Sequence, residues 1–252
     1  MLSDTQVQTY ETDGFVVPDL RMPEEALADI RERHSRLIAK HPEFTDYCPA
    51  LLDKDDGFVQ YARMPEILEM VEQLIGPDIA LWNMSFFAKP ALKGTTTPWH
   101  QDGEYWPIRP LATCSVWLAV DASTLENGCL KMMPGSHLDQ RLRPHNQNDG
   151  PGLALNQEIA ATEYDEEKAV PVILEAGQMS LHDVYLVHGS DPNRSPNPRR
   201  GITMRFMPTS SVFDRNIAAE MSAAKGLVNH EERPVYLMSG KDLSGSNSFV
   251  NA

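Results

Sequence analysis

Two histidines and one aspartate, His100, Asp102 and His188, are the residues whose types and spacing best fit a chemical role. Two imidazoles and one carboxylate on one face of a metal hold Fe(II) and leave the opposite positions open for a co-substrate and O2. On a β-strand, residues i and i+2 point to the same side, so His100 and Asp102 would share one metal ion. The competing interpretation is a His-x-Asp sequence that arises by chance, with an ordinary surface or core histidine.

A basic residue beyond the second histidine favours the metal hypothesis. Arg199 follows His188 by 11 residues. In a twisted antiparallel barrel, a residue at this spacing returns on the next strand beside the metal, where a guanidinium can bind a carboxylate through two parallel hydrogen bonds. A metal triad with an arginine anchor is what a 2-oxoglutarate-dependent oxygenase needs.

An ordered set of short motifs over nearly the whole chain resembles the phytanoyl-CoA dioxygenase family of Fe(II)/2-oxoglutarate oxygenases. No single motif is specific, but their order is. The motifs are Tyr10–Val17, Trp99–Asp102, Glu126–Leu130, Pro134–His137 and His188–Ser190, followed by Asn193, Ser195 and Arg199. The resemblance implies that His100, Asp102 and His188 are both the metal ligands and the catalytic centre. It also implies Fe(II) as the metal, with 2-oxoglutarate and O2 as co-substrates.

The family positions also suggest a binding site for 2-oxoglutarate. The carboxylate of 2-oxoglutarate that is far from the metal should bind Arg199, and the Ser190 hydroxyl should donate a hydrogen bond to it. Trp117 and Met84 resemble family residues at the same site, although simple core packing is the alternative for both. Adjacent strand residues point to opposite faces, so only one of Arg199 and Arg200 can be the clamp, and we favour Arg199.

The substrate should lie over the open face of the metal. Tyr105, Trp106 and Arg109 follow the His-x-Asp motif closely and are candidates to line its pocket, as is Asn83 on the preceding strand. The alternative is that the aromatic residues fill the barrel interior. His182 has the same strand parity as the second histidine ligand, so it is either a partner of a metal ligand or a packed histidine.

Composition restricts the partners of the chain. The 252 residues carry a formal net charge of −14, which repels nucleic acid and anionic membranes. We find no signal peptide and no apolar run long enough to span a membrane. The three cysteines form no close pair, which fits a reducing compartment. We therefore expect a cytoplasmic monomer or homodimer that acts on a small molecule, without nucleic acid or membrane partners.

The pattern of elements predicts a mainly β fold, a double-stranded β-helix (jelly roll, cupin-like) with flanking N-terminal helices. Residues 1–77 are largely helical support, and residues 78–210 form the β core from short strands broken by Gly, Pro and Asn turns. A polar segment near 138–168 interrupts the core as an insert or a lid, and residues 211–252 form a C-terminal extension. We expect residues 1–252 to form a single oxygenase domain.

These observations predict an Fe(II)- and 2-oxoglutarate-dependent dioxygenase that hydroxylates a C–H bond of a small metabolite and releases succinate and CO2. The family resemblance favours hydroxylation or a related oxidation, because chlorinating relatives have a small residue at the position of Asp102. Two alternatives are a non-oxidative, isomerase-like jelly-roll metalloenzyme and a metal-binding protein without catalytic activity. The sequence leaves the substrate open among acyl-CoA esters, amino acids, compatible solutes, phosphonates and natural products.

Overall fold

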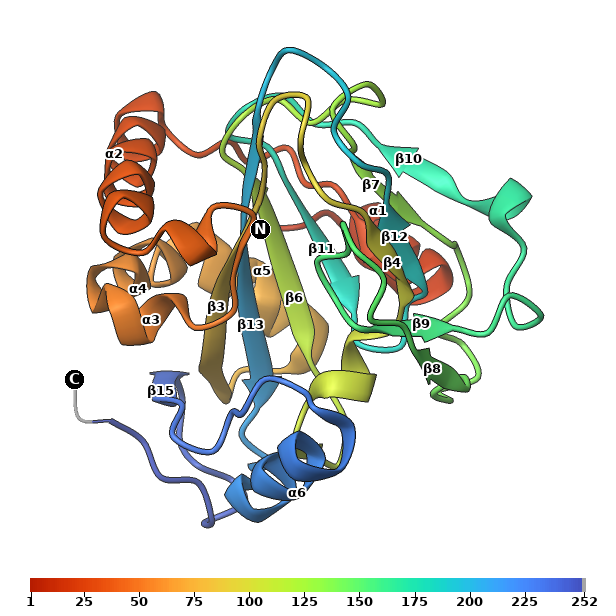
Figure 1. Cartoon of the computed structure of the whole chain (residues 1–252). Helices are drawn as coiled ribbons and strands as arrows, with labels where there is room; N and C mark the ends of the chain where they lie inside the picture. Colours follow the sequence, from red (N-terminus) through yellow and green to blue (C-terminus); the bar gives the residue numbers. More distant parts are fainter. Residues whose placement is uncertain (251–252) are drawn as a thin grey trace.

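The computed structural model describes residues 1–250 and consists of two facing antiparallel sheets flanked by helices (Figure 1). The larger sheet has seven strands in the order β1-β11-β6-β13-β3-β15, with β2 also paired to β3. The smaller sheet has the order β10-β7-β12-β4. This arrangement confirms the predicted jelly-roll class.

The bounds of the elements are as follows. The larger sheet contains β1 (Phe15–Val16), β2 (Tyr47–Cys48), β3 (Ile79–Lys89), β6 (Cys114–Ala119), β11 (Met179–Asp183), β13 (Arg199–Pro208) and β15 (Tyr236–Ser239). The smaller sheet contains β4 (Thr97–His100), β7 (Leu130–Met132), β10 (Val170–Val172) and β12 (His188–Ser190), and two further pairs are β5 (Ile108–Arg109) with β14 (Val212–Phe213) and β8 (His145–Gln147) with β9 (Gln157–Ile159). The helices are α1 (Asp4–Asp13), α2 (Glu24–Lys40), α3 (Leu51–Lys54), α4 (Val59–Ala62), α5 (Pro65–Ile75) and α6 (Arg215–Lys225), with short 3-10 turns η1 (Pro42–Phe44), η2 (Asp56–Phe58), η3 (Asp102–Tyr105) and η4 (Glu166–Lys168).

The two faces of the larger sheet have different tasks. Side chains of β13 alternate, so that Ile202, Met204 and Phe206 pack into the main hydrophobic core with residues of the N-terminal helices. Their neighbours Thr203 and Arg205 lie on the opposite face, which lines the interior between the two sheets. One face of the sheet therefore stabilises the fold, and the other carries the functional groups.

The N-terminal helices follow the signals in the sequence. α1 begins with a capping box, in which the Ser3 hydroxyl accepts from the Gln6 backbone and the Gln6 side chain accepts from the Ser3 backbone. α5 spans Pro65–Ile75, with proline in its first turn. It ends at Gly76, whose φ of 92° lies in a region that side chains disfavour.

Two local expectations need correction or refinement. The His-x-Asp motif does not lie wholly on a strand, because β4 ends at His100 and Asp102 begins the 3-10 turn η3. The insert at 138–168 is an ordered segment that contains the β8–β9 hairpin. No helix among residues 1–250 is long and apolar enough to cross a membrane.

Candidate active site

The predicted ligands meet where the smaller sheet faces the larger one. β12 pairs with β4 so that His188 stands opposite His100, and η3 turns Asp102 toward both. One donor atom from each of the three residues lies within 4.8 Å of the others, and all three side chains are buried. The tertiary fold thus gathers two imidazoles and one carboxylate, as the sequence predicted.

Backbone carbonyl groups orient both imidazole rings. His100 Nδ1 lies 2.8 Å from the Pro98 carbonyl oxygen, and His188 Nδ1 lies 3.0 Å from that of Leu186. A proton on Nδ1 donated to these carbonyls leaves each Nε2 unprotonated and free to bind a metal. Burial and the neighbouring His100 also lower the pKa of His188 well below its usual value, which favours the neutral form that metals need.

The third ligand, Asp102, is fixed by two groups from the larger sheet. Ser115 Oγ donates to Asp102 Oδ2 at 3.2 Å, and His182 Nε2 lies 3.4 Å from the same oxygen. Burial alone would raise the pKa of Asp102, but the neighbouring imidazoles of His100 and His182 outweigh it and hold that pKa well below its usual value. His182 therefore contacts the predicted ligand Asp102, which favours the first of its two predicted interpretations. The donor set of neutral imidazoles and an ionised carboxylate fits Fe(II).

A buried pocket next to the ligands contains the predicted arginine. Arg199 is 1% exposed, and neither its Nε nor its Nη1 has a hydrogen-bond partner in the described chain. Ser190 Oγ in the same pocket also lacks a partner, and the guanidinium lies 5.2 Å from the ring centroid of Trp117. Burial lowers the pKa of Arg199 to about 10, so it stays charged at neutral pH. A buried, unpaired cation is costly unless an anion joins it, so this pocket fits a carboxylate.

The neighbouring cations do not compete for this role. Arg200 points to the other face of the sheet and binds Asp121 through hydrogen bonds of 2.7 and 2.8 Å. Lys89, which the sequence analysis did not identify, donates to the backbone carbonyls of Thr95 and Asp191. Burial and the nearby Arg199 lower the pKa of Lys89 to about 6, so Arg199 is the group that keeps its charge.

Three predicted site residues lie outside the linings of the cleft and of the Arg199 pocket. Met84 packs in the main core, because its position on β3 faces the helices. Asn83 lies on the inner face but donates to the Pro49 carbonyl and does not line either pocket. Arg109 is exposed and donates to the Trp106 carbonyl. These positions depend on which face of a strand is covered, which spacing from the motif does not reveal.

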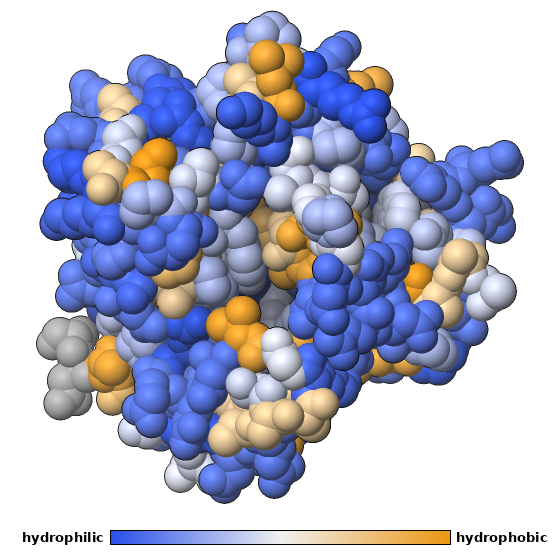
Figure 2. Space-filling view, in the orientation of Figure 1, coloured by the Kyte–Doolittle hydropathy of each residue, from blue (hydrophilic) through white to orange (hydrophobic). Residues whose placement is uncertain are grey.

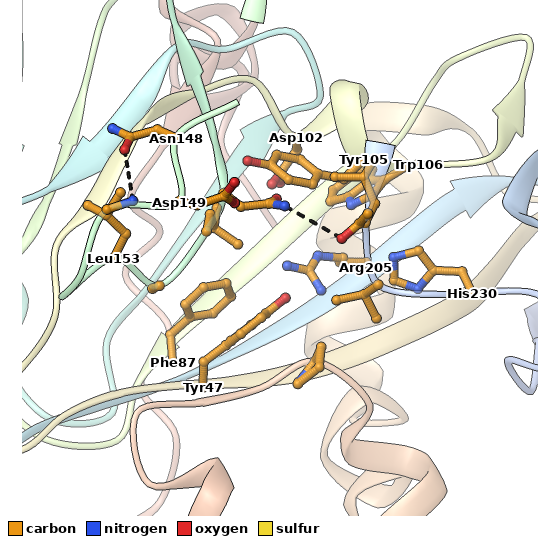
Figure 3. Close-up of a pocket in the computed structure, with 18 residues that line it drawn as sticks. Tyr47, Phe87, Asp102, Tyr105, Trp106, Asn148, Asp149, Leu153, Arg205 and His230 are labelled. Atoms are coloured by element: carbon orange, nitrogen blue, oxygen red, sulfur yellow. Dashed lines mark hydrogen bonds between the residues drawn. The ribbon is translucent and has the colours of Figure 1, made fainter. Parts of the chain in front are cut away.

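An open cleft of about 400 Å³ reaches the predicted metal-binding residue Asp102 (Figures 2 and 3). The predicted residues Tyr105 and Trp106 form part of its wall. Phe87, Asp102 and Arg205 border both this cleft and the buried pocket, so the two spaces adjoin at the ligand cluster. The sequence analysis missed Phe87 and Arg205, although Arg205 has the strand parity of Arg199 and could have been found from it.

The fold and the site together define a non-haem iron, 2-oxoglutarate-dependent oxygenase. The sequence model described as phytanoyl-CoA dioxygenase matches residues 10–201, and the chain belongs to this family. It is thus an enzyme of a family that uses iron, 2-oxoglutarate and O2. The donor atoms of the ligand cluster are consistent with iron, and the Arg199 pocket offers a cation that fits a carboxylate.

Individual relatives span most of the chain. The human peroxisomal phytanoyl-CoA dioxygenase is 28% identical over 233 residues, which cover 82% of this chain and 68% of that protein. The rat phytanoyl-CoA dioxygenase domain-containing protein 1 is 30% identical over 83% of this chain and 73% of its own length. Among solved structures, the non-heme monooxygenase ThoJ has a TM-score of 0.72 and 27% identity, over 97% of this chain and 86% of ThoJ. The epimerase SnoN has a TM-score of 0.71 at 21% identity, over 87% of this chain and 88% of SnoN.

A close approach between β13 and β6 gives a test of how Trp117 is held. A Cβ at Gly201 would lie 2.2 Å from the Trp117 ring, so Gly201→Ala must displace that ring from the floor of the Arg199 pocket. We expect a loss of about 1–3 kcal/mol in the free energy of unfolding, as for other overpacked cores, and weaker 2-oxoglutarate binding. Chemical denaturation and calorimetry measure both. The loss should shrink in a Trp117→Phe background, and an equal loss there would contradict the steric explanation.

Proposed function

We propose that this protein is an Fe(II)- and 2-oxoglutarate-dependent dioxygenase that hydroxylates a C–H bond of a small metabolite. The observation that carries the proposal is the buried, unpaired guanidinium of Arg199 beside the ligand cluster. A non-oxidative metalloenzyme with the same ligands has no need for such a group, because it binds no keto acid. An inactive metal-binding protein would gain stability by losing the unpaired charge.

Each part of the site has a distinct task in this reaction. His100, Asp102 and His188 hold the metal on one face, and Ser115 and His182 keep the carboxylate in place. Bound iron and 2-oxoglutarate together supply an oxidant derived from O2, with succinate and CO2 as co-products.

The pocket residues orient and shield the reactants. Arg199 and Ser190 bind the far carboxylate of 2-oxoglutarate, and Trp117 packs beside it. Phe87, Tyr105 and the other cleft walls orient the substrate and exclude water from the ligand cluster.

The cleft supports a small substrate in preference to an acyl-CoA. Among its described lining residues the charged groups are Asp102, Asp149 and Arg205, so a CoA ester with several phosphate charges would meet a single cation. The net charge of −14 repels polyanions as well. These features favour the small-metabolite proposal over the substrate in the name of the human relative.

The remaining proposals concern context. We propose that residues 1–252 act as one oxygenase domain, as a monomer or homodimer in the cytoplasm, without nucleic acid or a membrane as partner. The negative net charge of the chain supports the part of this proposal that excludes nucleic acid as a partner. Residues 251–252 lie outside the described residues. The human relative is named as peroxisomal, so imaging of a tagged chain in its native cell tests the cytoplasmic proposal.

An anaerobic titration tests the proposed function. Fe(II) and then 2-oxoglutarate are added to the apo-protein, and a visible charge-transfer band should form only when both are present. Under O2, the same protein should release succinate, and a true substrate should gain one oxygen atom from O2, as read by mass spectrometry. Met84→Leu is a matched control, because Met84 packs in the core and the substitution should leave 2-oxoglutarate affinity unchanged.

Two outcomes would contradict the proposal. No band despite bound iron would mean that the keto acid does not chelate the metal, and the isomerase-like alternative would replace ours. Succinate release with a product that is only epimerised or cyclised would retain the enzyme family and reject hydroxylation.

A further inference from the structure

A second buried arginine, Arg205, lies between the cleft and the ligand cluster. It is on β13, on the same face as Thr203, and is 4% exposed. Arg205 lines the cleft and also the buried pocket that contains the ligands. Figure 3 shows its guanidinium in the middle of the cleft residues, between Tyr47 and Trp106. No step described so far uses it.

The hydrogen bonds of Arg205 leave most of its donors unused. A guanidinium has five N–H donors. Arg205 Nη1 donates to Ser85 Oγ at 2.5 Å, and Nε is buried without a partner. Among residues 1–250, no carboxylate lies within ion-pair distance of Arg205, whereas the nearby Arg233 pairs with Asp53. A buried cation with so few partners is costly, and an incoming anion would remove that cost.

Aromatic rings hold the guanidinium in place. Its central carbon lies 5.1 Å from the ring centroid of Trp106, 5.9 Å from that of Phe87 and 6.0 Å from that of Trp82. Cation–π contacts of this kind offset part of the desolvation of the charge, but they satisfy none of its N–H groups. The rings thus orient Arg205 and leave its in-plane donors for a ligand.

The rest of the cleft adds apolar walls and no second cation. Tyr47, Phe87, Tyr105 and Trp106 line it, and the rings of Tyr47 and Phe87 lie 4.5 Å apart. The other basic residue in the described lining is His230. Burial, with Arg233 and Arg205 nearby, lowers the pKa of His230 to about 3, so this ring is neutral. The cleft therefore offers one positive charge among aromatic surfaces, and the carboxylates of Asp102 and Asp149 are the other charged groups in its described lining.

We infer that the substrate is a compact carboxylic acid with one negative charge, whose carboxylate binds Arg205 and whose apolar body lies between the aromatic walls. This inference deepens the proposed function and rests on it for the reaction. Arg205 borders both spaces, so an acid bound there has the carbons nearest its carboxylate beside the ligand cluster. The positioned C–H bond is then close to the acid group.

The test compares acids with their neutral amides by isothermal titration calorimetry, which needs neither metal nor turnover. The probes are benzoate, 3-phenylpropanoate and octanoate, each paired with its primary amide. At least one acid should bind the wild type about tenfold or more tightly than its amide, as expected for a charge-assisted contact. In Arg205→Gln this preference should fall to about twofold or less. Arg205→Lys should keep part of it, because the charge remains without the planar donors.

Two controls show that a changed preference for acids comes from the loss of Arg205 itself, and not from unfolding or from the variant having one positive charge fewer. Arg36→Gln removes an exposed arginine that pairs with Glu32 on α2, and it should retain the full preference for acids. Thermal unfolding of Arg205→Gln reports whether the variant is folded. If Arg205→Gln does not fold, the acid and amide affinities of the wild type and of Arg205→Lys still test whether Arg205 binds the carboxylate.

Two results would overturn the inference. The first is that no acid binds the wild type more tightly than its amide. The second is that Arg205→Gln keeps the preference for acids. If that variant also raises the dissociation constant of 2-oxoglutarate about tenfold, Arg205 would be assigned to the co-substrate. A preference for acids without the iron–2-oxoglutarate band would instead retain the acid site and reject the proposed oxygenase function.

Discussion

Replacement of Asp102 by alanine should abolish iron-dependent succinate production, with a loss on the order of a thousandfold or more. Loss of a group that only supports a metal ligand already costs about 10- to 100-fold in comparable sites, and Asp102 is itself a ligand in this assignment. It is also the one anionic member of the cluster, so its loss leaves two neutral imidazoles to hold a divalent cation. Succinate release and bound iron, measured on the same preparation, report both effects.

Variants that remove a ligand, compared with one that removes only a supporting hydrogen bond, show whether the loss of succinate production follows the loss of a metal ligand. His188→Ala should match Asp102→Ala, because both remove one of three ligands. Ser115→Ala should cost much less, about 10- to 100-fold, because it removes only a 3.2 Å hydrogen bond to the Asp102 carboxylate. Wild-type succinate production by either ligand variant would show that the triad assignment is wrong.

Arg199→Met should have opposite effects on stability and on co-substrate binding. In the absence of 2-oxoglutarate the variant should be more stable, by about 1–3 kcal/mol, because it removes a buried charge without a partner and keeps a similar volume. With 2-oxoglutarate present, wild type should gain stability with the logarithm of the ligand concentration above its dissociation constant, and the variant should gain less at each concentration. The apparent affinity for 2-oxoglutarate should fall about 10- to 100-fold, as charged hydrogen bonds of about 1.5–3 kcal/mol imply.

The neighbouring arginine is the matched control for this experiment. Arg200→Met breaks the paired contact with Asp121, so it should destabilise the protein and leave 2-oxoglutarate affinity unchanged. Denaturation of wild type and both variants, each with and without 2-oxoglutarate, measures all six combinations. If Arg199→Met kept wild-type affinity, the carboxylate would bind elsewhere, and Lys89 would be the next cation to replace.

Much of the fold and the centre of the site could be predicted from the sequence. Residues 1–77 were predicted as largely helical, and within them proline and glycine mark the two ends of α5 through their own backbone preferences. Strand alternation shows that only one of Arg199 and Arg200 can face the pocket, and the family resemblance favoured Arg199. The three residues of the ligand cluster could be chosen from the sequence because few residue types bind iron and their motif order is specific, and the structure brings them together.

Other features depend on long-range packing and could not be found in this way. Met84 was assigned to the pocket, but the helices cover its face of β3 and bury it in the core. A pattern of strands alone does not say which face will be covered. Asp102 was placed on a strand, whereas it begins η3, and this turn aims its carboxylate at ligands from two other strands.

The sequence by itself determined which functional groups are available, because His100, Asp102, His188 and Arg199 supply two imidazoles, one carboxylate and one guanidinium. The tertiary structure decided which groups surround that chemistry. His182 reaches Asp102, and Arg205 enters the cleft, only because β11, β6 and β13 pair in register on one sheet. The physical reason is that side-chain identity sets what a group can bind, whereas strand register and the covered face of a sheet set what it meets.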